Sequence, residues 1–216
     1  MSNLTPAEFP KSSKNTESVS QTESTIQVPK SRIDQIIKFA TIRMAKKIAP
    51  IDWITPNLIS YLSAILGGLV SGVFIYQQQF LLAVPWIIIS GILDNLDGDL
   101  AREKNLTSAS GEILDSVLDR YVDFCLIAAL ILVDTDQNLV PGLMALLGTS
   151  LVPYIRARSE AAGKSTVTSI GDRTMRTILI ILGLLTQQIF GLLIGLAIIS
   201  NIAALHRFIV AIRDQN

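Results

Sequence analysis

Three long stretches of the chain carry neither lysine nor arginine and are rich in aliphatic residues. They cover residues 48–101, 121–155 and 177–206. At about 20 residues per membrane crossing, each stretch has room for two short crossings once flanking turns are included. The pattern predicts spans near residues 56–76, 80–103, 110–133, 139–159, 172–187 and 190–213. We therefore expect an all-α integral membrane protein with six transmembrane helices.

The segment before the first predicted span has its own periodicity. At helical spacing, one face of residues 31–50 carries Ile33, Ile36, Ile37, Ala40 and Met44, and the basic residues lie elsewhere. This pattern predicts an amphipathic helix in the membrane interface, with a solvent-exposed linker helix as the alternative. The first thirty residues are rich in Ser, Thr and Glu and contain no apolar run, which predicts a disordered tail without a signal peptide. We expect a tail at 1–30, a juxtamembrane helix at 31–52 and a six-span domain at 53–216.

Composition and charge support a membrane location. Half of the 216 residues are hydrophobic, which is too apolar for an ordinary soluble domain, and a net charge of zero gives no reason to expect a nucleic-acid partner. The turns at 77–79, 134–138 and 187–188 carry no lysine or arginine, so they are expected to face outward. Both termini and the basic turns then face the cytoplasm of a multi-pass cell-membrane protein. The lone cysteine, Cys125, rules out an intramolecular disulfide.

Four aspartates lie inside or beside two consecutive predicted spans. Asp94 and Asp97 are three residues apart, and Asp115 and Asp119 are four apart, so each pair shares one helix face. Because the two helices are joined by a short turn, the four carboxylates can converge, where they would repel one another unless cations were bound. Oxygen ligands of this kind favour Mg²⁺ or Mn²⁺, and four carboxylates suit two ions about 4 Å apart.

The aspartates have two alternative interpretations. A solvated acidic loop fits poorly, because the carboxylates keep helical phase and Asp119 lies almost three turns into its span. A cation or proton path is a stronger rival, because intramembrane carboxylates also mark such paths. However, the four aspartates lie near one membrane face, and the opposite halves of the two spans carry no charge.

Small residues stand beside these carboxylates. Gly98, Ala101 and Gly111 would leave the backbone accessible to a large flat ligand such as a nucleotide. Small residues in membrane helices also allow close helix packing, so for each residue taken alone packing is the competing explanation.

Together these residues spell D-x2-D-G-x2-A-R-x8-G-x3-D-x3-D, from Asp94 to Asp119. This pattern resembles the signature of the CDP-alcohol phosphotransferase family, and the six-span layout extends the resemblance over everything after about residue 31. The resemblance implies an enzyme that joins a CDP-activated lipid or alcohol to a second alcohol and releases CMP. It also implies a homodimer.

The resemblance assigns roles residue by residue. Two Mg²⁺ ions would be held by Asp94, Asp97 and Asp115, with Asp119 completing the second site and acting as general base. The remaining candidates would bind the CDP-lipid: Gly98, Ala101 and Gly111 at the cytidine, Arg102 at the diphosphate, and Asn57 and Ser60 from the family-like stretch TPNLIS. Ser108 could donate to a phosphate, or it could be a plain helix N-cap.

A second polar segment, residues 153–176, bears on the acceptor alcohol. Arg156 and Arg158 are two residues apart and cannot share a helix face, so at least one should point into the bundle. An inward arginine beside a two-metal site is reasonable if it meets an acceptor phosphate, although arginine at the inner end of a span usually contacts lipid headgroups.

The stretch YIRARSEAAG followed by GDR resembles the phosphatidylinositol phosphate and archaetidylinositol phosphate synthase branch, with Asp172 where that branch commonly has Glu. This likeness implies inositol 1-phosphate as acceptor, CDP-diacylglycerol or CDP-archaeol as donor, and Arg158, Arg173 and then Arg156 as phosphate ligands. Glycerol 3-phosphate and serine remain open as acceptors. A transporter or an inactive scaffold would be a different class of protein.

Overall fold

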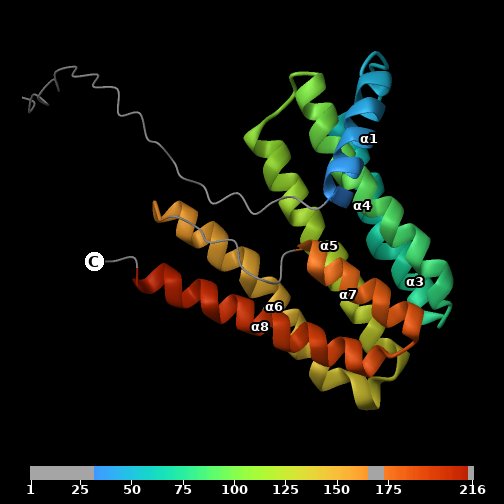
Figure 1. The fold of residues 1–216 in the computed structure, drawn as a ribbon, viewed down its shortest axis with the longest axis vertical. Coiled ribbons are helices and arrows are strands. Elements are labelled where there is room, and N and C mark those ends of the chain that lie inside the picture. The colour runs from blue at the N-terminus through green and yellow to red at the C-terminus, as the bar shows by residue number, and fades with distance from the viewer. Residues whose placement is uncertain (1–31, 165–172, 214–216) are drawn as a thin grey trace, which may run out of the picture.

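The computed structural model describes residues 32–164 and 173–213, and every regular element in these ranges is a helix (Figure 1). In chain order the elements are α1 (Arg32–Ile48), α2 (Pro56–Ala64), the π-helical turn η1 (Ile65–Val70), α3 (Ser71–Tyr76), α4 (Phe80–Glu103), α5 (Ala109–Val133), α6 (Thr135–Ala161), α7 (Arg173–Thr186) and α8 (Ile189–Arg213). The all-α fold class is confirmed. The predicted disordered tail lies outside the described residues.

Four helices in the described ranges are long and apolar enough to cross a membrane: Pro56–Tyr76, which joins α2, η1 and α3, together with Phe80–Glu103, Thr135–Ala161 and Ile189–Arg213. The protein is thus a multi-pass membrane protein by the composition of its helices. Helices also occupy the other two predicted span positions. However, α5 carries several charged residues among its 25, and the described part of α7 has 14 residues, so the six-span count remains a prediction.

Polar caps begin several helices where the sequence changes from polar to apolar. Thr55 accepts a hydrogen bond from the Leu58 amide at 3.3 Å, and Pro56 occupies the first turn, where a missing N–H costs nothing. Asp134 caps α6 by accepting from the Gln137 amide at 3.3 Å. These caps satisfy backbone N–H groups in the first turns of α2 and α6 and so mark where the two helices begin.

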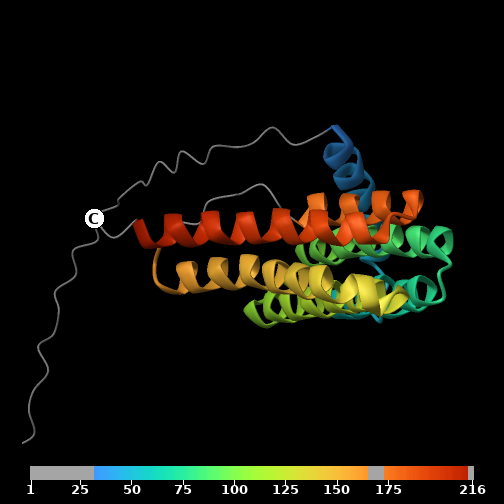
Figure 2. The ribbon, with the colours of Figure 1, turned by 90° about the horizontal axis from the view of Figure 1, so that it is seen from below.

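Helices α6 and α8 run alongside each other in both views (Figures 1 and 2). Glycine permits this approach: a Cβ at Gly148 would lie 2.8 Å from the backbone nitrogen of Asn201. A Cβ at Gly183 on α7 would lie 2.6 Å from the Cβ of Leu192 on α8. Close backbone approach through small residues is how helices pack in lipid, where water does not drive them together. Close packing through small residues therefore occurs at helix contacts away from the aspartates.

Helix α1 runs at a steep angle to the other helices (Figure 2). Thr41 and Ala45 are buried, and α1 packs on α4. Ala40 and Met44, expected on the apolar face, are both exposed, as is Phe39. Exposed apolar side chains suit a lipid interface, but the amphipathic helix in a membrane surface remains a prediction.

Candidate active site

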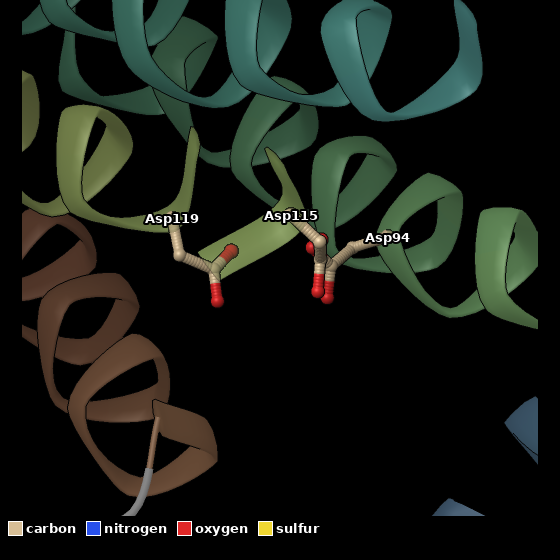
Figure 3. Close-up of side chains that lie close together, drawn as sticks. All are labelled: Asp94, Asp115 and Asp119. Atoms are coloured by element: carbon tan, nitrogen blue, oxygen red, sulfur yellow. The ribbon is translucent and has the colours of Figure 1, made fainter. Parts of the chain in front are cut away.

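Three of the four aspartates come together where α4 meets α5. Asp94, Asp115 and Asp119 each offer one carboxylate oxygen, and these oxygens lie within 4.8 Å of one another. Figure 3 shows the Asp94 and Asp115 carboxylates side by side, with Asp119 directed into the same space. All three side chains are half-buried. The helical spacing and the short α4–α5 turn produce this convergence for three of the four carboxylates that the sequence led us to expect together.

Asp97 faces a neighbouring space. Its carboxylate accepts a hydrogen bond from Ser60 Oγ at 2.5 Å, and the residue is buried. Because Ser60 belongs to α2, this bond ties the first span to α4. Asp97 is therefore not one of the three clustered carboxylates, although it lies on the same helix face as Asp94.

A pocket opens beside Asp97, between α2, α4 and α5. Its lining includes Asp97, Asp115 and every residue predicted to bind the CDP-lipid, namely Asn57, Ser60, Gly98, Ala101, Arg102, Ser108 and Gly111. Asp115 thus belongs both to the pocket and to the carboxylate cluster. Whatever fills the pocket lies next to the place where the three carboxylates could hold a cation.

The glycines keep this pocket open. A Cβ at Gly111 would lie 3.2 Å from Ser108 Oγ and 3.9 Å from Asn57 Oδ1, and a Cβ at Gly98 would lie 3.6 Å from Arg102 Nη2. Ser108 caps α5 by accepting from the Gly111 amide at 3.1 Å. The N-cap explanation for Ser108 is therefore met, and the same hydroxyl also lines the pocket.

Arg173, the first described residue of α7, lies directly across the carboxylates. Its Nη1 is 2.5 Å from Asp94 Oδ2 and 2.7 Å from Asp119 Oδ1. One guanidinium nitrogen therefore holds an aspartate from each of two helices and offsets part of their mutual repulsion. Arg120 adds a longer contact, 3.7 Å, to Asp119.

The other two arginines predicted to bind the acceptor phosphate lie elsewhere. Arg156 forms an ion pair with Glu160 at 2.9 Å, one turn along α6, and both Arg156 and Arg158 are exposed. The expectation that one of them is enclosed by the helices is not met, because the i,i+4 pairing draws Arg156 along the surface of its own helix. A role for either in phosphate binding stays a prediction.

Two pocket residues and one buried arginine near the site were not anticipated. Thr107 and Glu112 also line the pocket. They are adjacent in sequence to the predicted residues Ser108 and Gly111, and this adjacency could have predicted them. Arg176 is buried, with Nη2 3.3 Å from Asp123 and Nη1 donating to the Thr149 carbonyl at 3.2 Å. Its i,i+3 spacing from Arg173 could have placed both arginines on one inward face.

Comparisons with known proteins agree with this site. The family model described as CDP-alcohol phosphatidyltransferase matches residues 53–211. An archaetidylinositol phosphate synthase of Methanothermobacter thermautotrophicus is 36% identical over 141 residues, which is 65% of this chain and 69% of the relative. One from Pyrococcus horikoshii is 31% identical over 163 residues, covering 74% of this chain and 84% of the relative.

The fold also matches solved structures. The crystal structure of Mycobacterium tuberculosis phosphatidylinositol phosphate synthase with CDP-DAG bound aligns with a TM-score of 0.70 and 20% identity, over 79% of this chain and 92% of that one. The same protein in complex with manganese and citrate aligns with a TM-score of 0.69 and 20% identity, over 79% and 88%. The family match covers the carboxylates and the pocket and does not favour a transporter. The chain therefore belongs to the CDP-alcohol phosphatidyltransferase family, a family of enzymes.

Proposed function

We propose that the protein transfers the phosphatidyl-type group of a CDP-activated lipid to inositol 1-phosphate and releases CMP. One observation carries the proposal: Asp115 is shared by the pocket and the carboxylate cluster, and Arg173 lies across that cluster. A nucleotide in the pocket would have its diphosphate at the carboxylates, and an acceptor would approach from the side of Arg173.

The donor, CDP-diacylglycerol or CDP-archaeol, occupies the pocket through its nucleotide. Gly98, Ala101 and Gly111 admit the cytidine, Arg102 meets the diphosphate, and Asn57, Ser60 and Ser108 supply further polar groups. A CDP-DAG complex of the M. tuberculosis relative, which shares the fold, supports a donor of this class.

The donor set fits hard divalent cations. Carboxylate oxygens within 4.8 Å of one another are suitable ligands for Mg²⁺, with Mn²⁺ as a substitute. Asp94, Asp97, Asp115 and Asp119 would hold two such ions, and the manganese complex of the relative supports divalent metal use. When bound, the ions neutralise the charge of the diphosphate during displacement.

The residues of the chain then carry out the transfer. The acceptor hydroxyl oxygen forms a bond to the lipid-side phosphorus, the bond from that phosphorus to the bridging oxygen of CMP breaks, and CMP leaves. Asp119, on the cluster's far side from the pocket lining, accepts the hydroxyl proton as general base. Helix α5 carries both the pocket residue Asp115 and the proposed base Asp119, one turn apart.

The acceptor phosphate binds at Arg173. A guanidinium already beside two carboxylates is well placed to receive an anion once the carboxylates engage cations. Arg158, and then Arg156, are further ligands for the acceptor phosphate. The names of the archaeal relatives, archaetidylinositol phosphate synthases, support an inositol phosphate acceptor.

The membrane arrangement follows from the charge pattern. The chain crosses the membrane six times, with α1 in the interface and both termini and the site on the cytoplasmic side. It acts as a homodimer, as the family resemblance implies. The catalytic domain is residues 53–216, and the family match over 53–211 supports that boundary.

The test is an acceptor comparison with purified protein in detergent or nanodiscs. CDP-diacylglycerol and CDP-archaeol are each offered with inositol 1-phosphate, glycerol 3-phosphate, serine or free inositol, and CMP release and the lipid product are measured. We expect turnover with inositol 1-phosphate and poor turnover with free inositol. If free inositol, serine or glycerol 3-phosphate served equally well, the proposed acceptor would be wrong although the family assignment stands.

A further inference from the structure

Asp99 is a buried carboxylate that the proposed reaction does not use. It lies on α4, directly after the pocket residue Gly98, but its side chain faces α1. Its side chain is 3% exposed. Thr41 Oγ1 on α1 donates to Asp99 Oδ2 at 2.6 Å, and Lys38 Nζ lies 3.2 Å from Oδ1.

The third partner of Asp99 is a pocket residue. Arg102 Nη2 donates to Asp99 Oδ1 at 2.6 Å, one turn along α4. A buried carboxylate is costly unless cations and hydrogen bonds compensate it, and here two cations and a hydroxyl do so. This local network leaves Asp99 fully engaged and holds the long Arg102 side chain in one orientation.

That orientation points Arg102 at the pocket. Its guanidinium lies over Gly98, where an added Cβ would be 3.6 Å from Nη2 and 3.8 Å from Nη1. The Arg102 side chain is 59% exposed, so N–H groups beyond the one used by Asp99 remain accessible to a ligand. Asp99 thus decides where the remaining donors of the guanidinium point.

We propose that Asp99 is a positioning residue for the CDP-lipid, acting through Arg102. By holding Nη2 on the α1 side of α4, it presents the remaining donors of Arg102 to the diphosphate at the pocket. The inference rests on the proposed function in one respect, that Arg102 meets the diphosphate. It adds a positioning residue at a place that the family-like motif leaves unspecified and that lies outside the pocket lining.

A purely structural role, attaching α1 to α4, is the competing explanation. Helix α1 has other attachments, since Ala45 packs with Ile59, Leu96 and Leu100 in a separate apolar cluster. Thr41→Val removes the hydrogen bond from Thr41 on α1 to Asp99 and keeps the shape of the side chain, while leaving both Lys38 and Arg102 paired with Asp99. This substitution is therefore the matched control for helix attachment.

The experiment measures CDP-diacylglycerol binding to the full chain in detergent with Mg²⁺ and no acceptor, together with steady-state CMP release. The variants are Asp99→Asn, Arg102→Ala, the double variant and Thr41→Val. Asp99→Asn should raise the dissociation constant and KM for the CDP-lipid about 3- to 10-fold, or about 0.6 to 1.4 kcal/mol, with kcat within about twofold. The double variant should bind no more weakly than Arg102→Ala, and Thr41→Val should bind like wild type.

Three results would overturn the inference. They are unchanged CDP-lipid binding in Asp99→Asn, additive losses in the double variant, and a loss in Thr41→Val equal to that in Asp99→Asn. Because binding is measured without acceptor, failure of the inositol phosphate assignment leaves this test intact. Wild-type protein that bound no CDP-lipid would contradict the proposed function itself and, with it, this inference.

Discussion

Replacing Arg173 by Gln should separate two properties of the site. The guanidinium nitrogen lies 2.5 Å from Asp94 and 2.7 Å from Asp119, so it occupies space that a cation on these carboxylates would need. Gln keeps polarity and much of the length while removing the charge. The variant should therefore bind the acceptor phosphate less tightly, and it should bind divalent metal more tightly when no acceptor is present.

The magnitudes follow from charge-assisted hydrogen bonding. Loss of one charged partner costs about 1.5 to 3 kcal/mol, so KM for inositol 1-phosphate should rise about 10- to 150-fold. For the metal, the same contacts stabilise the metal-free state, and their loss should favour binding. The Arg173 side chain is 30% exposed, and solvent screening reduces the gain, so we expect the lower end, about tenfold tighter Mn²⁺.

Two assays check the pair of effects. Mn²⁺ titration followed by electron paramagnetic resonance gives metal affinity without turnover, and CMP release at varied inositol 1-phosphate gives KM. Arg43→Gln, the same change at an exposed arginine stacked on Phe39 at 4.6 Å, is the control and should leave both values unchanged. Weaker Mn²⁺ binding in Arg173→Gln, or a raised KM for the CDP-lipid in place of the acceptor, would refute the reasoning.

Three further outcomes are expected. Excess chelator should abolish CMP release and Mg²⁺ or Mn²⁺ should restore it, whereas activity that survives chelation would exclude a metal role. Asp119→Asn should bind CDP-lipid but lower kcat about 10²- to 10⁴-fold, and more than about a tenth of wild-type turnover would place the base elsewhere. Gly183→Ala should lower the free energy of unfolding by about 1 to 3 kcal/mol, because its Cβ would lie 2.6 Å from Leu192; thermal melts should show this while Gly191→Ala, with no atom within 4 Å, stays within about 1 kcal/mol of wild type.

The sequence predicted the helices well because two signals agreed. Apolar runs set the helix lengths, and the caps Thr55 and Ser108 set the starts of α2 and α5. Pro56–Tyr76 and Phe80–Glu103 match the expected ranges at both ends, although no side chain caps the start of α4. Asn57 and Ser60 on α2 were expected from the family resemblance. The other pocket residues with predicted roles could be grouped from the sequence, because they lie on α4, on α5 or in the short turn that joins them. Local spacing fixes such contacts without knowledge of the rest of the fold.

Contacts between helices far apart in the chain could not be predicted from the sequence. Arg158 and Arg173 looked alike as basic residues near span ends, yet Arg173 meets Asp94 and Asp119 while Arg158 is exposed. The difference depends on α7 packing against α4, and no local pattern encodes that neighbour. Asp99 was missed for the same reason, since its partner Thr41 lies 58 residues away on α1.

The two networks around α4 have different chemical consequences because they use opposite faces of one helix. On one face, Asp94 and Asp119 both contact Arg173. Cations would take the place of Arg173 at these carboxylates, and the acceptor phosphate would then bind Arg173. On the other face, Asp99 is closed off by Thr41, Lys38 and Arg102 and has no open position left for a ligand. Asp99 keeps Arg102 in place while Arg173 exchanges partners. Substitution of Asp99 or Arg102 should therefore alter donor binding, and substitutions on the α7 side should alter metal and acceptor binding.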